Sequence, residues 1–231
     1  MIIEFSKGST ILVDKPLNWT SFDVVNKIRW CLRKKLEIKK IKVGHAGTLD
    51  PLATGLLVIC IGAHTKKIDD LMKGVKVYTG KFLLGKTTPS YDLETDFDAE
   101  FPIAHITTRM LEDVREKFIG ETEQIPPVFS AKKIKGKRAY DMARSGKDVL
   151  LEANCIKINE FSLDTRNFPE IGFEVSCSKG TYIRTLVSDF GKKLDSGATL
   201  TELRRIRSGE QLIEESKSVS EWIDFIQNSP L

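Results

Sequence analysis

The chain has 231 residues and is 41% hydrophobic, which is enough to fill the core of one large domain and indicates a soluble globular protein. The longest apolar stretch, Leu56 to Ala63, is far shorter than the roughly 20 residues that cross a bilayer. The first residues, MIIEFSKGST, lack the basic segment followed by an apolar segment that forms a signal peptide. Membrane-spanning and secreted proteins are thereby excluded, and we expect a cytoplasmic protein whose net charge of +4 permits a nucleic-acid partner without requiring one.

The first predicted element is a helix over residues 21–36, with Ser21 as its cap. Apolar side chains recur there at helical spacing. The predicted buried stripe contains Phe22, Val25, Ile28, Leu32 and Leu36, completed by Trp30 and Cys31. Residues 75–84 alternate in a way that predicts a strand.

Later elements intersperse helices with strands. We expect helices over residues 108–118, closed by Gly120, and over about 181–194. Strands are expected over residues 155–163 and 171–177, the second with Ile171, Phe173, Val175 and Cys177 on one face. The closing segment SVSEWIDFI has a capping-box pattern at Ser218 and Glu221 that predicts a last helix. No repeat or linker is visible, so we expect an α/β (α+β) fold with a mixed sheet, as one domain over residues 1–231.

Residues 80–87, GKFLLGKT, match the phosphate-loop pattern G-x-x-x-x-G-K-[ST] letter for letter. That loop requires a glycine-rich turn whose backbone amides converge at a helix N-terminus. Here Lys81 to Leu84 continue the pattern of a strand, and Pro89 follows in a segment with turn character. We therefore interpret the stretch as a strand that runs into a turn and not as a nucleotide site.

A basic segment, residues 131–147, follows Pro126 and Pro127 and contains a single acid, Asp141. Such a segment suits an arm that contacts phosphates, and it equally suits a solvated lysine-rich loop. The residues predicted to contact an RNA backbone are Lys132, Lys133, Lys135, Lys137, Arg138 and Arg144. Residues 33–42 and the arginines Arg204, Arg205 and Arg207 would extend this footprint if they share its face.

The stretch VGHAGTLDPLATGLL (43–57) places His45 and Asp50 among glycines. Asp50 followed by Pro51 is a favoured helix start, with the carboxylate as the N-cap. Glycines 44 and 47 favour a different interpretation, in which the loop approaches a ligand closely and presents Asp50 outward. Neither His45 nor the four scattered cysteines have partners at the spacing of a metal site, so no metal is predicted. The residues by themselves leave both roles of Asp50 open.

Six separated motifs span the chain: DKPLNWTSFDVV (14–25), GHAGTLDPLATGLLVICIG (44–62), VYTGKFLLGKTTPSYDLETD (77–96), IPPVFSAKKIKGKRAYDMARSG (125–146), CSKGTYIRTLVSDFGKKL (177–194) and GATLTELRRIRSG (197–209). In this order they resemble the motifs of the TruB family of tRNA pseudouridine synthases. The resemblance implies the pseudouridine synthase catalytic fold: a mixed, largely antiparallel central sheet flanked by helices. It also implies a basic insertion at about residues 125–150 that grips RNA.

The same resemblance assigns roles to individual residues. Asp50 corresponds to the catalytic aspartate that acts on the target uridine. The substrate-binding positions correspond to His45 beside the everted nucleotide, Tyr78 stacked on the uracil, Tyr182, Arg184, the backbone at Leu203, and the first-motif lysine Lys15. A guanidinium keeps a carboxylate ionised in a cleft that excludes water, so we predict an ion pair between Asp50 and Arg184.

The implied activity is isomerisation of the T-loop uridine of tRNA to pseudouridine, after the nucleotide is flipped out of its stack. The N1 glycosidic bond breaks and the uracil rejoins the ribose through C5. An ionised carboxylate can attack C1′ or C6, or take a proton from C2′. Because no electrons or phosphates are exchanged, no cofactor is expected. The expected partner is the T-arm stem-loop of tRNA, with no membrane and no obligate protein partner.

Two departures from the family pattern stand out. The third motif reads TTPSYDLETD where many members have a T-D-T-x-D-x-x-G arrangement, and the chain is too short for the C-terminal RNA-binding PUA domain of many bacterial members. Two other functions stay as alternatives. One is an RNA-binding or tRNA-folding module with secondary catalysis, and the other is a pseudouridylase subunit guided by a separate RNA.

Overall fold

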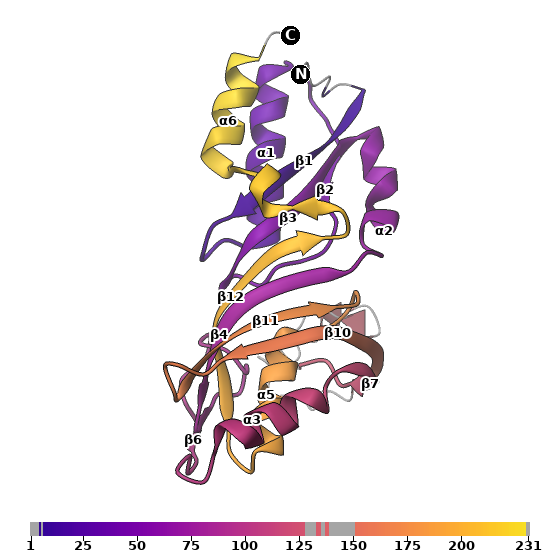
Figure 1. Cartoon of the computed structure of the whole chain (residues 1–231). Coiled ribbons are helices and arrows are strands. Elements are labelled where there is room, and N and C mark those ends of the chain that lie inside the picture. Colours follow the sequence, from indigo (N-terminus) through magenta and orange to yellow (C-terminus); the bar gives the residue numbers. More distant parts are fainter. Residues whose placement is uncertain (1–4, 6, 128–132, 135–136, 139–150, 230–231) are drawn as a thin grey trace. The chain divides into compact units, whose positions relative to one another are not determined.

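The computed structural model describes residues 5, 7–127, 133–134, 137–138 and 151–229. The chain divides into two compact units, Met1–Tyr78 with Leu203–Leu231 (unit 1) and Thr79–Glu202 (unit 2). Figure 1 shows the elements of both units in sequence colours. Two strands, β4 (Lys76–Leu84) and β12 (Ala198–Ser208), run from one unit into the other.

The sheet of unit 1 is built around β3 (Ala53–Gly62). Strands β1 (Gly8–Lys15) and β2 (Val43–His45) pair with β3 in antiparallel fashion, and β12 pairs with it in parallel. The edges are short strands, β13 (Gln211–Leu212) beside β12 and β14 (Lys217–Ser218) beside β1. Every residue from Leu56 to Ile61 is completely buried, as expected for a strand covered on both faces.

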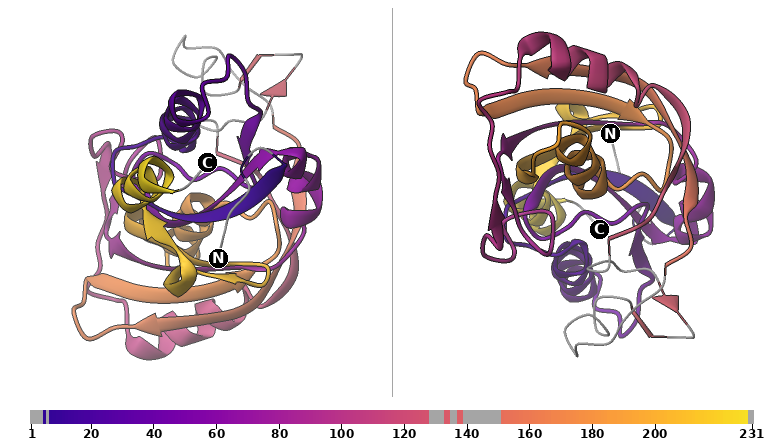
Figure 2. Two further views of the ribbon diagram at one scale, coloured as in Figure 1. Left: turned by 90° about the horizontal axis from the view of Figure 1, so that it is seen from above. Right: turned by 90° about the horizontal axis from the view of Figure 1, so that it is seen from below.

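Two helices of unit 1, α1 (Ser21–Lys35) and α6 (Val219–Asn228), lie side by side (Figures 1 and 2). The Cys31 Sγ lies 3.9 Å from the Ile223 carbonyl oxygen, and the Lys35 Nζ donates to the Gln227 carbonyl at 2.9 Å. The predicted capping box of α6 is confirmed at Ser218 and Glu221. The remaining helical segments of this unit are α2 (Ile68–Leu71) and the 3-10 turns Ala63–Lys67 and Ile213–Glu215.

Helix α1 confirms the predicted element but corrects its cap and its buried stripe. Its N-cap is Thr20, which forms a capping box with Asp23, so the assignment of Ser21 as the cap was wrong. Phe22 and Trp30 are 59% and 53% exposed, because the buried stripe is rotated away from them. The side chains that α1 buries are Ser21, Val24, Val25, Ile28, Cys31 and Leu32.

Unit 2 continues the sheet in the order β12-β4-β11-β10-β7, where β11 spans Glu170–Cys177, β10 spans Asn154–Asp164 and β7 spans Gly120–Gln124. The pairings of β10 with β11 and β7 are antiparallel. Helices α3 (Thr108–Glu116) and α5 (Ile183–Lys193) pack with it. Two small antiparallel pairs complete the unit, β5 (Lys86–Thr87) with β6 (Ala99–Glu100) and β8 (Lys133–Ile134) with β9 (Lys137–Arg138).

The core of unit 2 is a cluster of phenylalanines from the strands and helices that the sequence predicted. Phe190 of α5 is surrounded by Phe82, Phe118 and Phe161, with ring centroids 5.4 to 5.9 Å away. Phe173 of β11 adds contacts to Phe82 and Phe161. The predicted face of β11 is confirmed, because its four alternating apolar residues are all buried. Phe161 packs edge to face against Phe173 and Phe190, and Phe118 stacks on Phe190, so these rings anchor α5 to the sheet.

Residues 80–87 lie in β4 and β5, so the interpretation of GKFLLGKT as strand and turn is confirmed. Gly80 packs so closely against the Glu202 carbonyl that a Cβ atom would overlap it. The mixed, largely antiparallel sheet with its helices also confirms the predicted fold class. Within the described residues, none of the helices has the length and apolar content that crossing a bilayer requires.

Candidate active site

Asp50 occupies a tight turn between β2 and β3. The Ala53 N–H donates to the Asp50 carbonyl at 3.1 Å, with Pro51 at the second position of the turn, where its fixed φ is favourable. Strand β3 begins at Ala53, so no helix follows Asp50. The helix-cap alternative is therefore wrong, and the half-buried carboxylate belongs to a turn that joins two strands.

Ser21 fixes the residue before Asp50. Its Oγ accepts from the Leu49 N–H at 2.8 Å and donates to the Leu49 carbonyl at 3.0 Å, and both groups are buried. Ser21 thus satisfies the main-chain donor and acceptor of a residue 28 positions along the chain. The first motif, DKPLNWTSFDVV, holds the turn through this contact.

Lys15 and Asn18 fix the residue after Asp50. The Lys15 side chain is completely buried, and its Nζ donates to the carbonyls of Pro16, Trp19 and Pro51 at 2.9, 2.6 and 3.4 Å. The Asn18 N–H donates to the same Pro51 carbonyl at 2.9 Å. The main chain on both sides of Asp50 is thereby held by the first motif, and Lys15 lies within the protein interior.

The charge of Lys15 is coupled to that of Asp50. Burial lowers the pKa of Lys15 from 10.5 to about 8, while the carboxylates of Asp50 and Asp23 raise it and the Arg205 guanidinium lowers it further. Coulomb attraction is mutual, so the Lys15 ammonium also favours the ionised form of the Asp50 carboxyl. A negative charge at the turn is the state that nucleophilic or basic chemistry requires.

The lowered pKa of Lys15 predicts a dependence of stability on pH. Below about pH 8 the folded protein carries the full cost of burying the Lys15 charge. Between about pH 8 and pH 10.5 the folded state releases this proton while the unfolded chain still keeps it, so the cost falls as the pH rises. The free energy of unfolding of the wild type, relative to Lys15→Met, should therefore rise through this window, to a limit of about 3 kcal/mol. Urea unfolding of both proteins across the window measures this difference, and a difference independent of pH would contradict the assignment.

Residues 46–52 join β2 to β3 and carry Asp50, and they are called the catalytic loop for the predicted role of Asp50. Arg205 holds the start of this loop from within the core. It is 1% exposed, and it donates through Nε to the Leu56 carbonyl at 2.8 Å and through Nη2 to the Gly47 carbonyl at 3.0 Å. Gly47 has a φ of +105°, a conformation that favours glycine. The guanidinium thus fixes Gly47 between β2 and the Asp50 turn.

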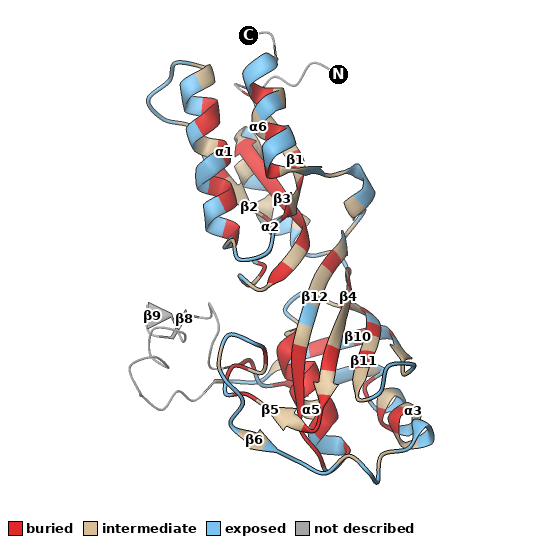
Figure 3. Ribbon diagram, turned by 90° about the vertical axis from the view of Figure 1, so that its left-hand side faces the viewer, coloured by how far each residue is buried: buried red, intermediate tan, exposed pale blue. Residues whose placement is uncertain are grey.

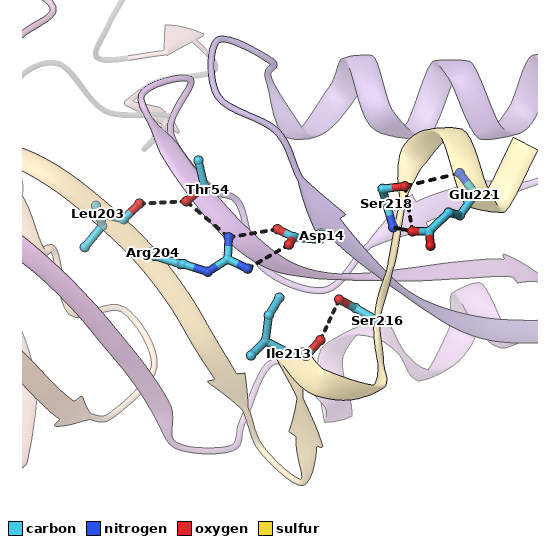
Figure 4. A network of polar contacts seen from close by, with 8 residues as sticks. All are labelled: Asp14, Thr54, Leu203, Arg204, Ile213, Ser216, Ser218 and Glu221. Carbon is cyan, nitrogen blue, oxygen red and sulfur yellow. Dashed lines mark hydrogen bonds and ion pairs between the residues drawn. The ribbon is translucent and has the colours of Figure 1, made fainter.

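The suggestion that Arg204, Arg205 and Arg207 extend an RNA footprint is wrong for Arg205, because its side chain is buried. Arg204 forms a bidentate ion pair with Asp14 at 2.7 and 3.0 Å (Figure 4). Only Arg207 is largely exposed, and its Nε donates to the Gly209 carbonyl at 2.8 Å. The alternation of side chains along β12 places Arg204 and Arg205 on opposite faces. Arg207 lies on the same face as Arg205 but nearer the end of the strand.

His45 ends β2 opposite Ile59, at the beginning of the catalytic loop. Burial lowers the pKa of its imidazole, the Arg205 guanidinium adds to the lowering, and the Gly47 backbone acts in the opposite sense. The ring is therefore neutral at pH 7. Its buried Nδ1 makes no hydrogen bond of normal geometry to any of the described residues.

Leu203 and Tyr78 lie on the strands that span the two units. Leu203 of β12 is paired with Ala53, the first residue after the Asp50 turn, and its carbonyl accepts from Thr54 Oγ1 at 3.4 Å (Figure 4). The backbone predicted to contact substrate thus adjoins the catalytic loop. Tyr78 of β4 is 9% exposed and lies at the end of the unit 1 segment.

Arg184 and Tyr182 belong to unit 2, at the start of α5. Arg184 is 4% exposed, with its Nε 3.6 Å from Asp92 Oδ2 and its Nη1 donating to the Ser90 carbonyl at 3.3 Å. Asp92 is also buried, so the two charges compensate each other in the interior. The main chain of Tyr182 exchanges two hydrogen bonds with the Gln124 side-chain amide, at 2.8 and 3.0 Å.

Three of the six predicted RNA-backbone residues lie outside the described part of the chain. This applies to Lys132, Lys135 and Arg144. Lys133, Lys137 and Arg138 belong to β8 and β9, whose backbones pair as a small hairpin. In the part of the chain that the structure describes, no cluster of three His, Cys, Asp or Glu side chains could hold a metal ion.

Sequence reasoning missed four residues that hold predicted site residues or their loop. Ser21 and Arg205 hold the catalytic loop, Asp92 holds Arg184, and Gln124 holds Tyr182. All four lie within or beside quoted motifs, which is the only signal that marked them. Asp92 comes from the motif that departs from the family pattern, so the departing segment supports an arginine assigned to the pocket.

The two neighbours Thr20 and Ser21 allow a matched test of the positioning role. Ser21→Ala leaves the buried N–H and C=O of Leu49 unsatisfied, which should cost about 1–3 kcal/mol of stability. It should also lower kcat roughly ten- to a hundredfold, because the turn that carries Asp50 is released. Thr20→Ala removes the helix cap and costs about 1 kcal/mol, yet should leave kcat close to that of the wild type. Equal losses of kcat in both variants would contradict the role of Ser21.

Comparisons with known proteins agree with the motif resemblance. A family model described as TruB family pseudouridylate synthase (N terminal domain) matches residues 33–183. A protein of Phocaeicola vulgatus named tRNA pseudouridine synthase B is 53% identical over 225 residues, and the alignment covers 96% of each chain. A protein of Flavobacterium johnsoniae with the same name is 48% identical over 225 residues, and the alignment covers 97% of this chain and 98% of that one. Among solved structures, a chain in the crystal structure of a Cbf5-Nop10-Gar1 complex aligns with a TM-score of 0.69 and 26% identity, over 96% of this chain and 55% of that chain. The protein therefore belongs to the TruB family of pseudouridylate synthases.

Proposed function

We propose that the protein is a tRNA pseudouridine synthase that isomerises the T-loop uridine of tRNA, with Asp50 as the catalytic residue. The observation that carries this proposal is the construction of the Asp50 turn. Its flanking residues Leu49 and Pro51 are held by Ser21, Lys15 and Asn18, so an aspartate that caps no helix is kept in one place. The name shared by relatives of nearly equal length supports the substrate.

The reaction needs one ionised carboxylate, and it exchanges no electrons or phosphates. The bond between N1 and C1′ breaks, the uracil turns, and a bond between C5 and C1′ forms. C5 loses its proton to solvent and N1 takes up a proton from solvent, so the product is an isomer of the substrate. An ionised Asp50 serves this sequence as a nucleophile or as a base, and the Lys15 ammonium favours its ionised form. The held turn supplies orientation, which is worth several kcal/mol when reacting atoms must meet in one geometry.

The remaining assigned residues bind the flipped nucleotide in this proposal. The ring of Tyr78 stacks on the uracil, and the neutral His45 fills the place that the nucleotide vacates. Tyr182, the Leu203 backbone and Arg184 keep the substrate-binding roles that the family resemblance assigns to them. The ion pair between Arg184 and Asp50 stays a prediction, and in the structure the Arg184 Nε lies 3.6 Å from Asp92 Oδ2. Lys15 acts through the loop that it holds, because its side chain is completely buried.

The partner in this proposal is the T-arm stem-loop, gripped by the basic insertion at about residues 125–150. Recognition then rests on RNA shape and on unpaired bases more than on helix sequence. No protein or guide RNA is required. The near-complete mutual coverage with tRNA pseudouridine synthase B proteins supports this over a guided subunit, since the chain covers only 55% of the Cbf5-complex chain.

Tritium release tests the proposal on the full chain alone. Folded tRNA and an isolated T-arm stem-loop, both labelled with tritium at uridine C5, are incubated with the purified protein. We expect stoichiometric release at one uridine from both RNAs, because the C5 proton is lost when C5 bonds to C1′. Absence of release from folded tRNA would refute the enzyme and leave an RNA-folding module. Release only after a guide RNA and partner proteins are added would establish the guided subunit instead.

A further inference from the structure

Helix α1 exposes a large aromatic side chain that its packing does not need. The stripe that faces the core contains Val24, Val25, Ile28, Cys31 and Leu32, and the opposite side of the helix is exposed (Figure 3). Trp30 lies on that exposed side with 53% of its surface accessible. A single exposed indole does not by itself mark a binding site, so what matters is the set of residues around Trp30.

Trp30 lines a groove of about 570 Å³, within the size range of small-molecule sites. The residues that line it are Asn18, Trp19, Asp23, Asn26, Lys27 and Trp30. Two indoles supply flat apolar surface, and two asparagine amides supply donors and acceptors of the kind that read the edges of a base. Arg29 donates to Asn26 Oδ1 at 2.8 Å, which holds one of these amides in place.

The charge around Trp30 is positive. Lys27 Nζ and Lys34 Nζ lie 5.6 and 5.4 Å from the centroid of the Trp30 ring, one turn before it and one turn after it. The last turn of α1 adds Arg33 and Lys35. An aromatic face between two ammonium groups matches a nucleotide, whose base stacks on the ring while its phosphates meet the cations. Asp23 adds one negative charge to the lining of the groove, so the basic residues of this face outnumber the acid.

Hydrogen bonds link two residues that line the groove to the turn that carries Asp50. Asn18, which lines the groove, donates from its N–H to the Pro51 carbonyl at 2.9 Å. The carbonyl of Trp19, also a lining residue, accepts from Lys15 Nζ at 2.6 Å, and Lys15 binds Pro51 as well. All of these residues belong to unit 1. An RNA held at Asp50 therefore has chain within reach of the groove.

We propose that this groove binds one unpaired nucleotide of the same RNA whose uridine reacts at Asp50, with the base stacked on Trp30 and the flanking phosphates near Lys27 and Lys34. The inference rests on the proposed function. It adds a second contact with single-stranded RNA, separate from the reacting nucleotide and from the basic insertion.

Binding of an unmodified tRNA transcript tests the groove. The measurement is made in an Asp50→Asn background, so that no turnover disturbs the equilibrium. Trp30→Ala should weaken binding roughly five- to a hundredfold, as expected for the loss of one stacked base, and Trp30→Phe should restore part of it. Phe22→Ala is the matched control, because Phe22 is 59% exposed on the same helix and does not line the groove.

Lys27→Ala should reduce the salt dependence of binding by about one phosphate contact, whereas Lys73→Ala, at an exposed ion pair with Asp70, should not.

Two results would overturn the groove. One is an unchanged affinity of Trp30→Ala for tRNA, which would show that the Trp30 side chain does not contact the tRNA. The other is an equal loss in Phe22→Ala, which would trace the effect to the helix as a whole. Tritium release by the protein with Asp50 intact is measured separately. Its result shows whether the proposed activity is wrong or only the proposed nucleotide binding in the groove. Thermal unfolding of Trp30→Ala close to that of its parent shows that the helix is intact.

Discussion

Asp50→Asn will form no pseudouridine in tRNA at a measurable rate, with kcat lowered roughly 10⁴-fold or more. Asparagine matches aspartate in size, but its amide is neither a base nor a nucleophile at neutral pH. The turn itself should persist, because it depends on the Asp50 main-chain carbonyl and the Ala53 N–H. The free energy of unfolding should therefore change by only about 0.5 kcal/mol. Initial rates of tritium release and urea unfolding measure the two effects.

Asp70→Asn is the control for the loss of one carboxylate in the same unit. Asp70 forms an exposed ion pair with Lys73, so the variant should leave the free energy of unfolding nearly unchanged and keep its rate. The Asp50→Asn protein should still bind tRNA, which shows that the loss is chemical. A variant at Asp50 that keeps more than about a tenth of the wild-type rate would remove Asp50 from the reaction.

Arg205→Met should damage both stability and activity, although Arg205 is too deeply buried to touch RNA. The substitution leaves the carbonyls of Leu56 and Gly47 without their donors, which should cost about 3–5 kcal/mol of stability. The release of Gly47 frees the loop that leads to Asp50, so kcat should fall by roughly a hundredfold in protein that is still folded. Urea unfolding and single-turnover rates below the unfolding transition separate the two effects.

Two variants calibrate this result. Arg205→Lys keeps the charge, but one ammonium group replaces the rigid fork that reaches both carbonyls, so its stability and rate should lie between those of the wild type and Arg205→Met. Arg207→Met lies two residues further along β12 and is exposed, so it should leave stability and rate nearly unchanged. A fully active Arg205→Met protein would show that the catalytic loop does not depend on this contact.

Local patterns in the sequence were sufficient to predict most helices and strands. The alternation in residues 171–177 and the capping box at Ser218 and Glu221 each depend on neighbours within one element, and both are confirmed. The assignment of Ser21 failed for a nonlocal reason. Both Thr20 and Ser21 can cap a helix, and only the pairing of Ser21 with Leu49, 28 residues away, decides between them.

The candidate site shows the same limit. Proline after Asp50 is compatible with a helix start and with a tight turn, and what selects the turn is the pairing of β3 with its neighbours. The three arginines of β12 look alike in sequence, although the alternation of a strand already separates Arg204 from Arg205. The burial of Lys15 and Arg205 against main-chain carbonyls had no signal beyond their presence in motifs, because a basic residue is normally exposed.

Mapping of pseudouridine at single-nucleotide resolution tests the central claim most directly. Unmodified tRNA is treated with the wild type and with Asp50→Asn, and every uridine is examined. The account predicts one new pseudouridine, in the T loop, with the wild type and none with the variant. A pseudouridine at another position, or the T-loop pseudouridine formed equally by both proteins, would contradict it.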